Sequence, residues 1–196
     1  MDSQLTLFET PPPAPLKYRL FVGIFPSPGA VESISDLQVE SRDRFGLRGR
    51  FRPRDILHMT LHHIDDYPEI PERIIETAAE ACAVAFADQS SLEITLDHTK
   101  SFGGRRGNLP FVLVNPNGNQ SLMELHHRLI TELAKRKLAS RGDFKFVPHV
   151  TLLYDQQRVP EQPVSPIAWR ANEVILVLSH LGETRYEQLR RWALGE

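Results

Sequence analysis

A pattern of histidine, an apolar residue, threonine and leucine occurs twice in this 196-residue chain. The copies are residues 58–61 (His-Met-Thr-Leu) and residues 149–152 (His-Val-Thr-Leu), and each lies in a segment with the composition of a β-strand. Successive side chains of a strand point to opposite faces, so the histidine and threonine of each copy share one face. The pattern therefore predicts two strands, each with a polar pair on one side and apolar residues buried on the other.

The two polar pairs would form one site if the two strands met side by side. The candidate catalytic residues are then His58, Thr60, His149 and Thr151. A neutral imidazole can deprotonate water while a protonated one delivers a proton to a leaving oxygen, and a free histidine, with a pKa near 6.5, supplies both forms around neutral pH. Threonine hydroxyls can stabilise the charge that develops in the transition state. Such a set suits phosphodiester cleavage and needs no metal.

A single histidine on a strand is usually a core or surface residue. Two copies of the pattern, in corresponding positions of two half-chains, favour a shared functional cleft instead. Each copy also follows a predicted helix, so the two halves resemble each other loosely.

The remaining pattern of the chain is a mixture of strands and helices without regular alternation, which favours an α+β fold. Strand-like runs cover residues 19–25, 56–64, 92–96, 111–114, 146–153 and 174–178. Helical patterns cover residues 29–40, 71–87 and 119–138, and a last strand or short helix is expected over 184–193.

Composition limits the domain bounds, the class of ligand and the cellular compartment that we expect for the protein. Residues 1–15 end in a proline-rich run and predict a flexible tail before a domain that spans 16–196. The net charge of −2 argues against a protein that coats long nucleic acid. Cys82 is the only cysteine and is expected in the core. With no secretory signal and no apolar run of about 18 residues, we expect a cytoplasmic monomer that does not enter a membrane.

The sequence resembles the 2H phosphoesterase superfamily, in particular its LigT-like and 2′–5′ RNA ligase-like members. The resemblance covers about residues 16–194. It is carried by both patterns, by residues 20–26 (Leu-Phe-Val-Gly-Ile-Phe-Pro), and by residues 181–185 with Arg191 and Trp192. It implies a bilobal α+β fold: two pseudo-symmetric lobes of antiparallel sheet, with outer helices and a central cleft.

The resemblance also implies an activity. It is metal-independent hydrolysis of RNA 2′,3′-cyclic phosphate ends to 2′-phosphomonoesters, without a cofactor and sometimes with reversible 2′–5′ ligation. We assign His149 as the base and His58 as the acid. Two alternatives stay open: a phosphodiesterase acting on a small cyclic nucleotide or a 2′–5′ oligonucleotide, and a non-catalytic binder of RNA ends.

One position departs from the best-known LigT-like pattern. An arginine that helps to hold the phosphate often follows the second motif, and Tyr154 stands there in this chain. Two interpretations stay open: an arginine from elsewhere meets the phosphate, or the substrate differs. Six arginines lie between residues 42 and 54, in a segment that we interpret as a basic loop beside the cleft or, alternatively, as a solvated loop. The candidate substrate-binding residues are Tyr154, Arg105, Phe102 and Arg52.

The other histidines receive simpler interpretations. By strand alternation His62 shares the face of His58, but a metal site would need further converging ligands, so no metal is expected. His126 and His127 lie in a predicted helix and are expected on its surface.

The tail contains a segment that resembles the pentapeptide by which bacterial proteins dock on the replicative sliding clamp. The segment is Gln4, Leu5, Thr6, Leu7 and Phe8. Leu7 and Phe8 would enter an apolar pocket, Gln4 would fix the register by hydrogen bonds, and the prolines would hold the arm clear of the domain. The alternative is a tail without a partner.

A peptide of residues 1–12 should therefore bind purified clamp saturably below about 100 μM, an affinity of ~5.5 kcal/mol. The matched control carries Leu7→Ala and Phe8→Ala and should not bind. Equal binding of the two peptides would exclude this partner.

Overall fold

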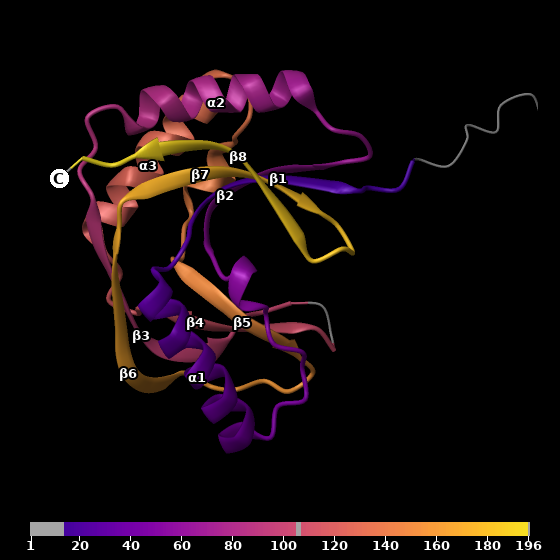
Figure 1. Ribbon diagram of the computed structural model, residues 1–196, viewed down its shortest axis with the longest axis vertical. Helices are drawn as coiled ribbons and strands as arrows, with labels where there is room; N and C mark the ends of the chain where they lie inside the picture. Colours follow the sequence, from indigo (N-terminus) through magenta and orange to yellow (C-terminus); the bar gives the residue numbers. More distant parts are fainter. Residues whose placement is uncertain (1–13, 105–106, 196) are drawn as a thin grey trace, which may run out of the picture.

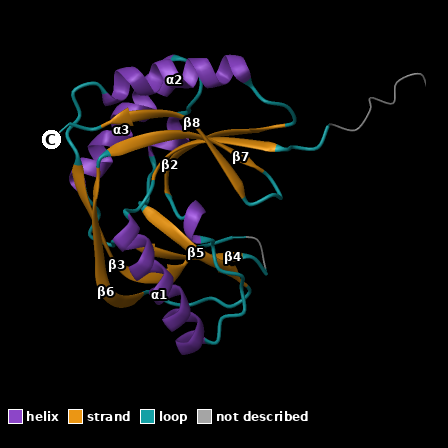
Figure 2. Cartoon of the chain, viewed as in Figure 1, coloured by secondary structure: helices purple, strands orange, loops and turns teal. Residues whose placement is uncertain are grey.

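In the part of the chain that the structure describes, eight strands pair antiparallel and three helices pack against them (Figures 1 and 2). The computed structural model describes residues 14–104 and 107–195. Both Arg105 and the tail segment 4–8 lie outside the described residues. The strands are β1 (Tyr18–Ile24), β2 (Met59–Tyr67), β3 (Leu92–Ser101), β4 (Leu109–Val114), β5 (His149–Asp155), β6 (Gln162–Ala171), β7 (Glu173–His180) and β8 (Arg185–Ala193). The helices are α1 (Pro28–Phe45), α2 (Glu72–Phe86) and α3 (Gln120–Lys135), with short 3₁₀ turns η1 (Arg54–Ile56) and η2 (Arg141–Phe144).

The sheet divides into two lobes at its centre. Its strand order is β6-β3-β4-β5-β2-β1-β7-β8, and β2 joins β5 only through the pairing of Met59 with Val150. From this point the two halves of the sheet diverge, and they lie in the upper and lower parts of Figure 1. The predicted bilobal α+β fold is therefore confirmed, and the sheets of its two lobes meet edge to edge through the two motif strands.

Each motif strand ends a strand–helix–strand unit whose helix covers the other lobe. Helix α1 connects β1 to β2 but packs on β5 and β6, where Gln38 Nε2 donates to the Leu152 carbonyl at 2.7 Å. Helix α3 connects β4 to β5 but packs chiefly on α2, with smaller and equal contacts to β2 and β3 (Figure 1). The two halves are thus interleaved, and each lobe needs a helix from the other.

The apolar residues of both motifs lie in the core, as the alternation predicts. Met59, Val150 and Leu152 are fully buried and Leu61 nearly so. Burial of each such side chain stabilises the fold by roughly 1.5–3 kcal/mol. This anchoring fixes the opposite face of each strand toward the space between the lobes.

A β-bulge interrupts the alternation at the leucine of each motif. In β2, Thr60 pairs with Gly23 and His62 with Val22, so that Leu61 has no partner. In β5 the register skips Leu152 in the same way, between Thr151 and Leu153. A bulge inserts one residue and reverses the side-chain alternation beyond it.

The bulges decide which residues after each motif face the cleft. His63 and Tyr154, three positions after the motif threonines, line the cavity between the lobes. His62 instead turns toward α3, is 6% exposed, and donates from Nε2 to the Leu138 carbonyl at 3.2 Å. The expectation that His62 shares the face of His58 was therefore wrong, because simple alternation stops at Leu61.

Several element boundaries also differ from the sequence-based expectations. Helix α1 continues to Phe45 and ends at Gly46, whose φ of 64° suits glycine, so the first part of the expected basic loop is helical. Strand β6 was not predicted because it contains Pro163 and Pro166, which an edge strand tolerates. Residues 185–193 form a strand, and Cys82 is buried in α2 as expected. Within the described ranges, no helix is long and apolar enough to cross a membrane.

The arginine-rich segment is fixed to β5 by Asp155. The Asp155 Oδ2 atom accepts hydrogen bonds from the backbone N–H groups of Arg48 (2.6 Å) and Gly49 (2.7 Å). The chain at Gly49 passes so close to β5 that a Cβ atom there would lie 1.9 Å from the Tyr154 carbonyl oxygen. Only glycine fits at this position without a shift of the backbone.

Gly49→Ala should therefore destabilise the protein, because backbone would have to move away from backbone. We expect a cost of about 2–3 kcal/mol, which lowers Tm by roughly 5–10 °C. Gly29→Ala is the matched control: a Cβ there contacts nothing within 4 Å, so Tm should stay the same or rise slightly. Thermal unfolding followed by circular dichroism measures both, and equal Tm values would contradict the close approach at Gly49.

Candidate active site

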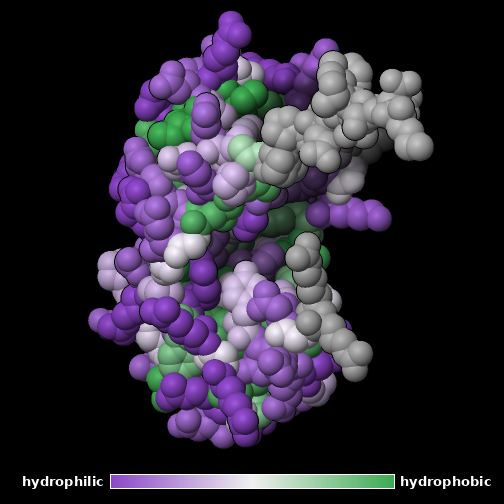
Figure 3. Space-filling model, turned by 90° about the vertical axis from the view of Figure 1, so that its right-hand side faces the viewer, coloured by the Kyte–Doolittle hydropathy of each residue, from purple (hydrophilic) through white to green (hydrophobic). Residues whose placement is uncertain are grey.

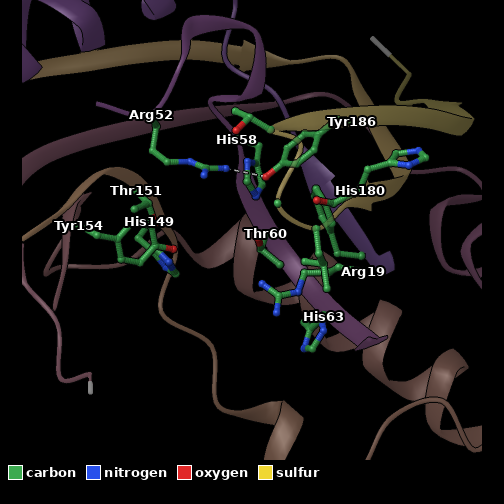
Figure 4. Close-up of a pocket in the computed structure, with 15 residues that line it drawn as sticks. Arg19, Arg52, His58, Thr60, His63, His149, Thr151, Tyr154, His180 and Tyr186 are labelled. Atoms are coloured by element: carbon green, nitrogen blue, oxygen red, sulfur yellow. Dashed lines mark hydrogen bonds between the residues drawn. The ribbon is translucent and has the colours of Figure 1, made fainter. Parts of the chain in front are cut away.

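Both motifs line one cavity of about 440 Å³ between the lobes. The surface is hollowed there, as Figure 3 shows, and the close-up in Figure 4 shows the side chains that line the hollow. The structure brings together all four candidate catalytic residues, His58 and Thr60 from the β2 side and His149 and Thr151 from β5. The pairing of Met59 with Val150 accounts for this, because it sets the two motifs directly beside each other.

The two histidines are held by the same backbone interaction. His58 Nδ1 lies 2.8 Å from the Ile56 carbonyl oxygen, and His149 Nδ1 lies 2.8 Å from the Val147 carbonyl oxygen. A carbonyl only accepts, so each Nδ1 must carry the hydrogen. In a neutral imidazole the lone pair then belongs to Nε2. Each ring is therefore fixed in one tautomer with Nε2 available for proton transfer.

Aromatic side chains enclose both imidazoles. His58 contacts Phe21 (4.8 Å between ring centroids), Tyr186 (5.2 Å) and Phe25 (6.0 Å). His149 contacts the edge of Phe102 at 4.9 Å. Phe21 and Phe102 thus play corresponding roles in the two halves of the site.

This enclosure lowers the pKa of both histidines. Burial lowers the pKa of His58 to about 4, with smaller contributions in the same direction from the charges of Arg52 and His149 and opposition from the Ile56 carbonyl. Burial likewise lowers the pKa of His149. Both imidazoles are therefore neutral at pH 7 in the free protein, unlike the mixture of forms expected from an ordinary pKa. A bound anion would raise both values again.

Arg52, a predicted substrate-binding residue, lies beside His58 and connects the two lobes. Its backbone N–H donates to the Leu152 carbonyl at 2.8 Å, which attaches it to β5. Its Nη2 group donates to the Tyr186 hydroxyl on β8 at 2.8 Å (Figure 4). The guanidinium therefore crosses the cavity next to the candidate acid.

The other predicted binding residues have different outcomes. Tyr154 lines the cavity and is 42% exposed, so its ring is available to a ligand. Phe102 lies in an adjoining hollow behind His149. Three of the five remaining arginines of the 42–54 segment contact the fold: Arg42 stacks on Phe51 at 4.5 Å, Arg44 lies over Phe45 at 5.2 Å, and Arg54 donates to Ser35.

Sequence reasoning missed several cavity residues, and those with ionisable side chains are Arg19, His63, His180 and Tyr186. Arg19 is bound by Asp66, which also accepts a hydrogen bond from His63 Nε2 at 2.9 Å. The alternation of β1 could have indicated Arg19, because it precedes Phe21 by two positions. His63 could not be found without the bulge.

His126 corrects another expectation. It is 3% exposed and stacks on Phe146, with ring centroids 4.2 Å apart, whereas a surface position was predicted. The reason is the spacing of α3: residue 126 lies on the same stripe as the buried Leu122, Leu129 and Leu133. His127 is exposed as expected. Within the described residues, no three His, Cys, Asp or Glu side chains converge as metal ligands would.

Comparisons with known proteins agree with this architecture. The family profile described as "2'-5' RNA ligase superfamily" matches residues 25–182. Among solved structures, apo E. coli LigT aligns with a TM-score of 0.69 at 24% identity, covering 93% of this chain and 100% of that one. The protein TT0787 of Thermus thermophilus aligns with a TM-score of 0.73 at 21% identity, covering 91% and 99%. No curated protein sequence matches the chain.

The family match spans most of the chain, including both motifs, so the protein belongs to the 2′-5′ RNA ligase superfamily. The resemblance to LigT-like 2H phosphoesterases is thereby confirmed, and the solved structures confirm the fold.

The buried histidines should make the protein sensitive to acid. The pKa values of His58, His62, His126 and His149 are all lowered, chiefly by burial, so the unfolded chain binds more protons than the folded one below pH 6.5. Above pH 6.5 these histidines are neutral in both the folded and the unfolded state, and the free energy of unfolding has its full value. The free energy of unfolding then decreases as the pH falls toward 4, the value to which burial lowers the pKa of His126.

His126→Phe keeps a ring against Phe146 and removes one of these protonations. Between pH 7.5 and 4.5 its Tm should fall less than that of the wild type, as thermal unfolding can measure. His127→Phe on the exposed face of the same helix is the control and should leave the slope unchanged. Parallel slopes for all three proteins would contradict the role of His126.

Proposed function

We propose that the protein hydrolyses RNA 2′,3′-cyclic phosphate ends to 2′-phosphomonoesters by acid–base catalysis between its two motif histidines. The observation that carries this proposal is the matched pair of Nδ1–carbonyl hydrogen bonds, which leave two Nε2 atoms for one cavity. A pair of this kind is what in-line displacement at phosphorus requires. One group accepts a proton on the attacking side, and the other donates a proton on the leaving side.

The reaction then runs as follows. His149 Nε2 takes a proton from water, and the resulting oxygen attacks the phosphorus of the cyclic phosphate. The bond from phosphorus to O3′ breaks, and His58 Nε2–H gives its proton to O3′, which leaves a 2′-phosphate. Thr60 and Thr151 donate to the non-bridging oxygens. His149 has then gained a proton and His58 has lost one, so the next turnover requires only that each exchanges a proton with solvent.

The environments of the two histidines support this order of roles. The ring of His149 contacts one aromatic side chain of the described residues, whereas that of His58 contacts three, so His149 is more accessible to water. His58 has to be protonated to act as the acid, and burial and Arg52 oppose this in the free protein. A phosphate bound between them offsets the Arg52 charge and raises the pKa of His58. Binding of the substrate would thus favour the protonated form of His58 that acts as the acid.

The charge of the cavity also supports an anionic substrate. Among the described residues that line it are two arginines and four histidines, and no carboxylate. Arg52 supplies the guanidinium that Tyr154 cannot, and Tyr154 offers a ring on which a base can stack. E. coli LigT has been solved in complexes with 3′-AMP and with phosphate. A nucleotide phosphate is accordingly our proposed ligand for the corresponding cleft here.

One experiment can distinguish the alternative functions, because the alternative substrates would all react through the same groups. The same displacement, with a ribose 5′-hydroxyl in place of water as the nucleophile, would give a 2′–5′ linkage, and cleavage of a 2′–5′ oligonucleotide or a small cyclic nucleotide uses the same groups. A panel of cyclic mononucleotides, RNA ends and 2′–5′ linked oligomers distinguishes these substrates. A non-catalytic binder would retain RNA ends and turn over none of the panel.

His58→Ala and His149→Ala should each lower kcat by ~10²–10⁴-fold, because each removes one proton-transfer group. Their Tm values show whether they fold, and His127→Ala serves as a control distant from the cavity. Wild-type activity should persist in a strong chelator. Near-normal rates for both variants on every substrate would exclude the mechanism, and loss of activity in chelator that a divalent ion restores would exclude its metal independence.

A further inference from the structure

Four side chains form a row across the lobe that contains β2, β1, β7 and β8. Asp66 pairs in register with Arg19, Arg19 with Ser179, and Ser179 with Tyr186. Arg19, Ser179 and Tyr186 all line the cavity, and Tyr186 contacts His58 with 5.2 Å between ring centroids. The cavity therefore continues along β1 past the catalytic centre and passes over a guanidinium there.

Asp66 holds that guanidinium in a fixed orientation. Arg19 Nε donates to Asp66 Oδ1 and Nη2 donates to Oδ2, both at 2.7 Å. These bonds lower the pKa of Asp66, which therefore stays ionised. In the described part of the chain Arg19 Nη1 has no hydrogen-bond partner, and Figure 4 shows the guanidinium between Thr60 and His63. A forked cation held in this way suits a phosphate oxygen, because little side-chain freedom remains to be lost.

The two arginines of the cavity occupy different positions. Arg52 lies beside His58 and reaches Tyr186 from the other lobe, whereas Arg19 lies near His63. Along β1, Arg19 is four residues from Gly23, the partner of Thr60, which corresponds to about 13 Å between their backbones at ~3.3 Å per residue, and the Arg19 side chain extends from there back toward His63. A cavity of about 440 Å³ is large enough for a nucleotide rather than for a phosphate alone.

We propose that Arg19 binds a second phosphate of the substrate, on the 5′ side of the reacting nucleotide. This inference rests on the proposed function, in which Arg52 and the two histidines hold the reacting phosphate. The protein then selects nucleotides that carry a 5′-phosphate group over a bare cyclic nucleoside phosphate. That group is either the linking phosphate of an RNA strand or the free 5′-phosphate of a mononucleotide.

Three substrates test the proposal: adenosine 2′,3′-cyclic phosphate, its 5′-phosphorylated form, and the dinucleotide ApA ending in a 2′,3′-cyclic phosphate. In the wild type, kcat/KM should be ~10–100-fold higher for the two substrates with a second phosphate, as expected for hydrogen bonds to a charged group. Arg19→Gln should bring this ratio close to one. The control Arg190→Gln removes an exposed ion pair with Glu76 outside the cavity and should keep the ratio.

The pattern among substrates separates the sources of the phosphate. A preference for both phosphate-bearing substrates supports the linking phosphate of a strand, and a preference for the 5′-phosphorylated mononucleotide alone supports a mononucleotide. If only the dinucleotide is preferred and Arg19→Gln keeps that preference, the extra nucleoside is recognised and the proposal is wrong. It is also wrong if Arg19→Gln lowers kcat/KM equally on all three substrates.

A binding measurement separates this proposal from the proposed function. Calorimetry compares adenosine 2′-phosphate with adenosine 2′,5′-bisphosphate on the wild type and on Arg19→Gln, and it requires no turnover. The bisphosphate should bind the wild type ~10–100-fold more tightly and lose this advantage in the variant. If the wild type hydrolyses no substrate but shows this pattern, the subsite stands and the hydrolytic function falls. Equal Kd values for both ligands on the wild type would overturn the subsite.

Discussion

The single backbone pairing between Met59 and Val150 determines the site, because it is the only named pairing between the two motif strands in the described structure. The apolar residue of each motif lies at this junction, fully buried, and the histidine before it and threonine after it are consequently brought to the same cavity. A different register between β2 and β5 would leave each histidine facing an unrelated part of the other lobe. Core packing and the assembly of the candidate active site therefore depend on the same two residues.

Much of this arrangement could be predicted from the sequence. Alternation within each motif correctly separates Met59 and Leu61 from His58 and Thr60, since it requires only that the strand be regular over four residues. It fails beyond the motif. The bulge at Leu61 is set by the pairing with β1, and no local property of the residues 61–63 indicates it. The side chain that faces the cleft is consequently His63.

The residues that complete the cavity come from positions that local patterns do not connect. Arg19 and Tyr186 belong to the first and last strands and become neighbours only through β7, which pairs with both. The burial of His126 was accessible in principle, since its position on the apolar stripe of α3 can be read from helical spacing. Its chemical type suggested a surface position, but an aromatic partner, Phe146, makes the buried ring favourable. Residue type was thus a poorer guide than spacing.

Helices α1 and α3, each of which covers the lobe opposite its own strands, limit how far the cleft can open. A lobe that rotated away from its neighbour would have to drag one helix off the sheet it covers, and it would break the bond from Gln38 to Leu152. Hinge opening is therefore opposed by the burial that stabilises each lobe. The width of the cleft is set during folding, and the entropy of arranging the four candidate catalytic side chains is lost at that stage rather than on each encounter with a ligand. This connectivity favours a preformed cleft of fixed width over one that closes on its ligand, and such a cleft selects ligands by their size and shape.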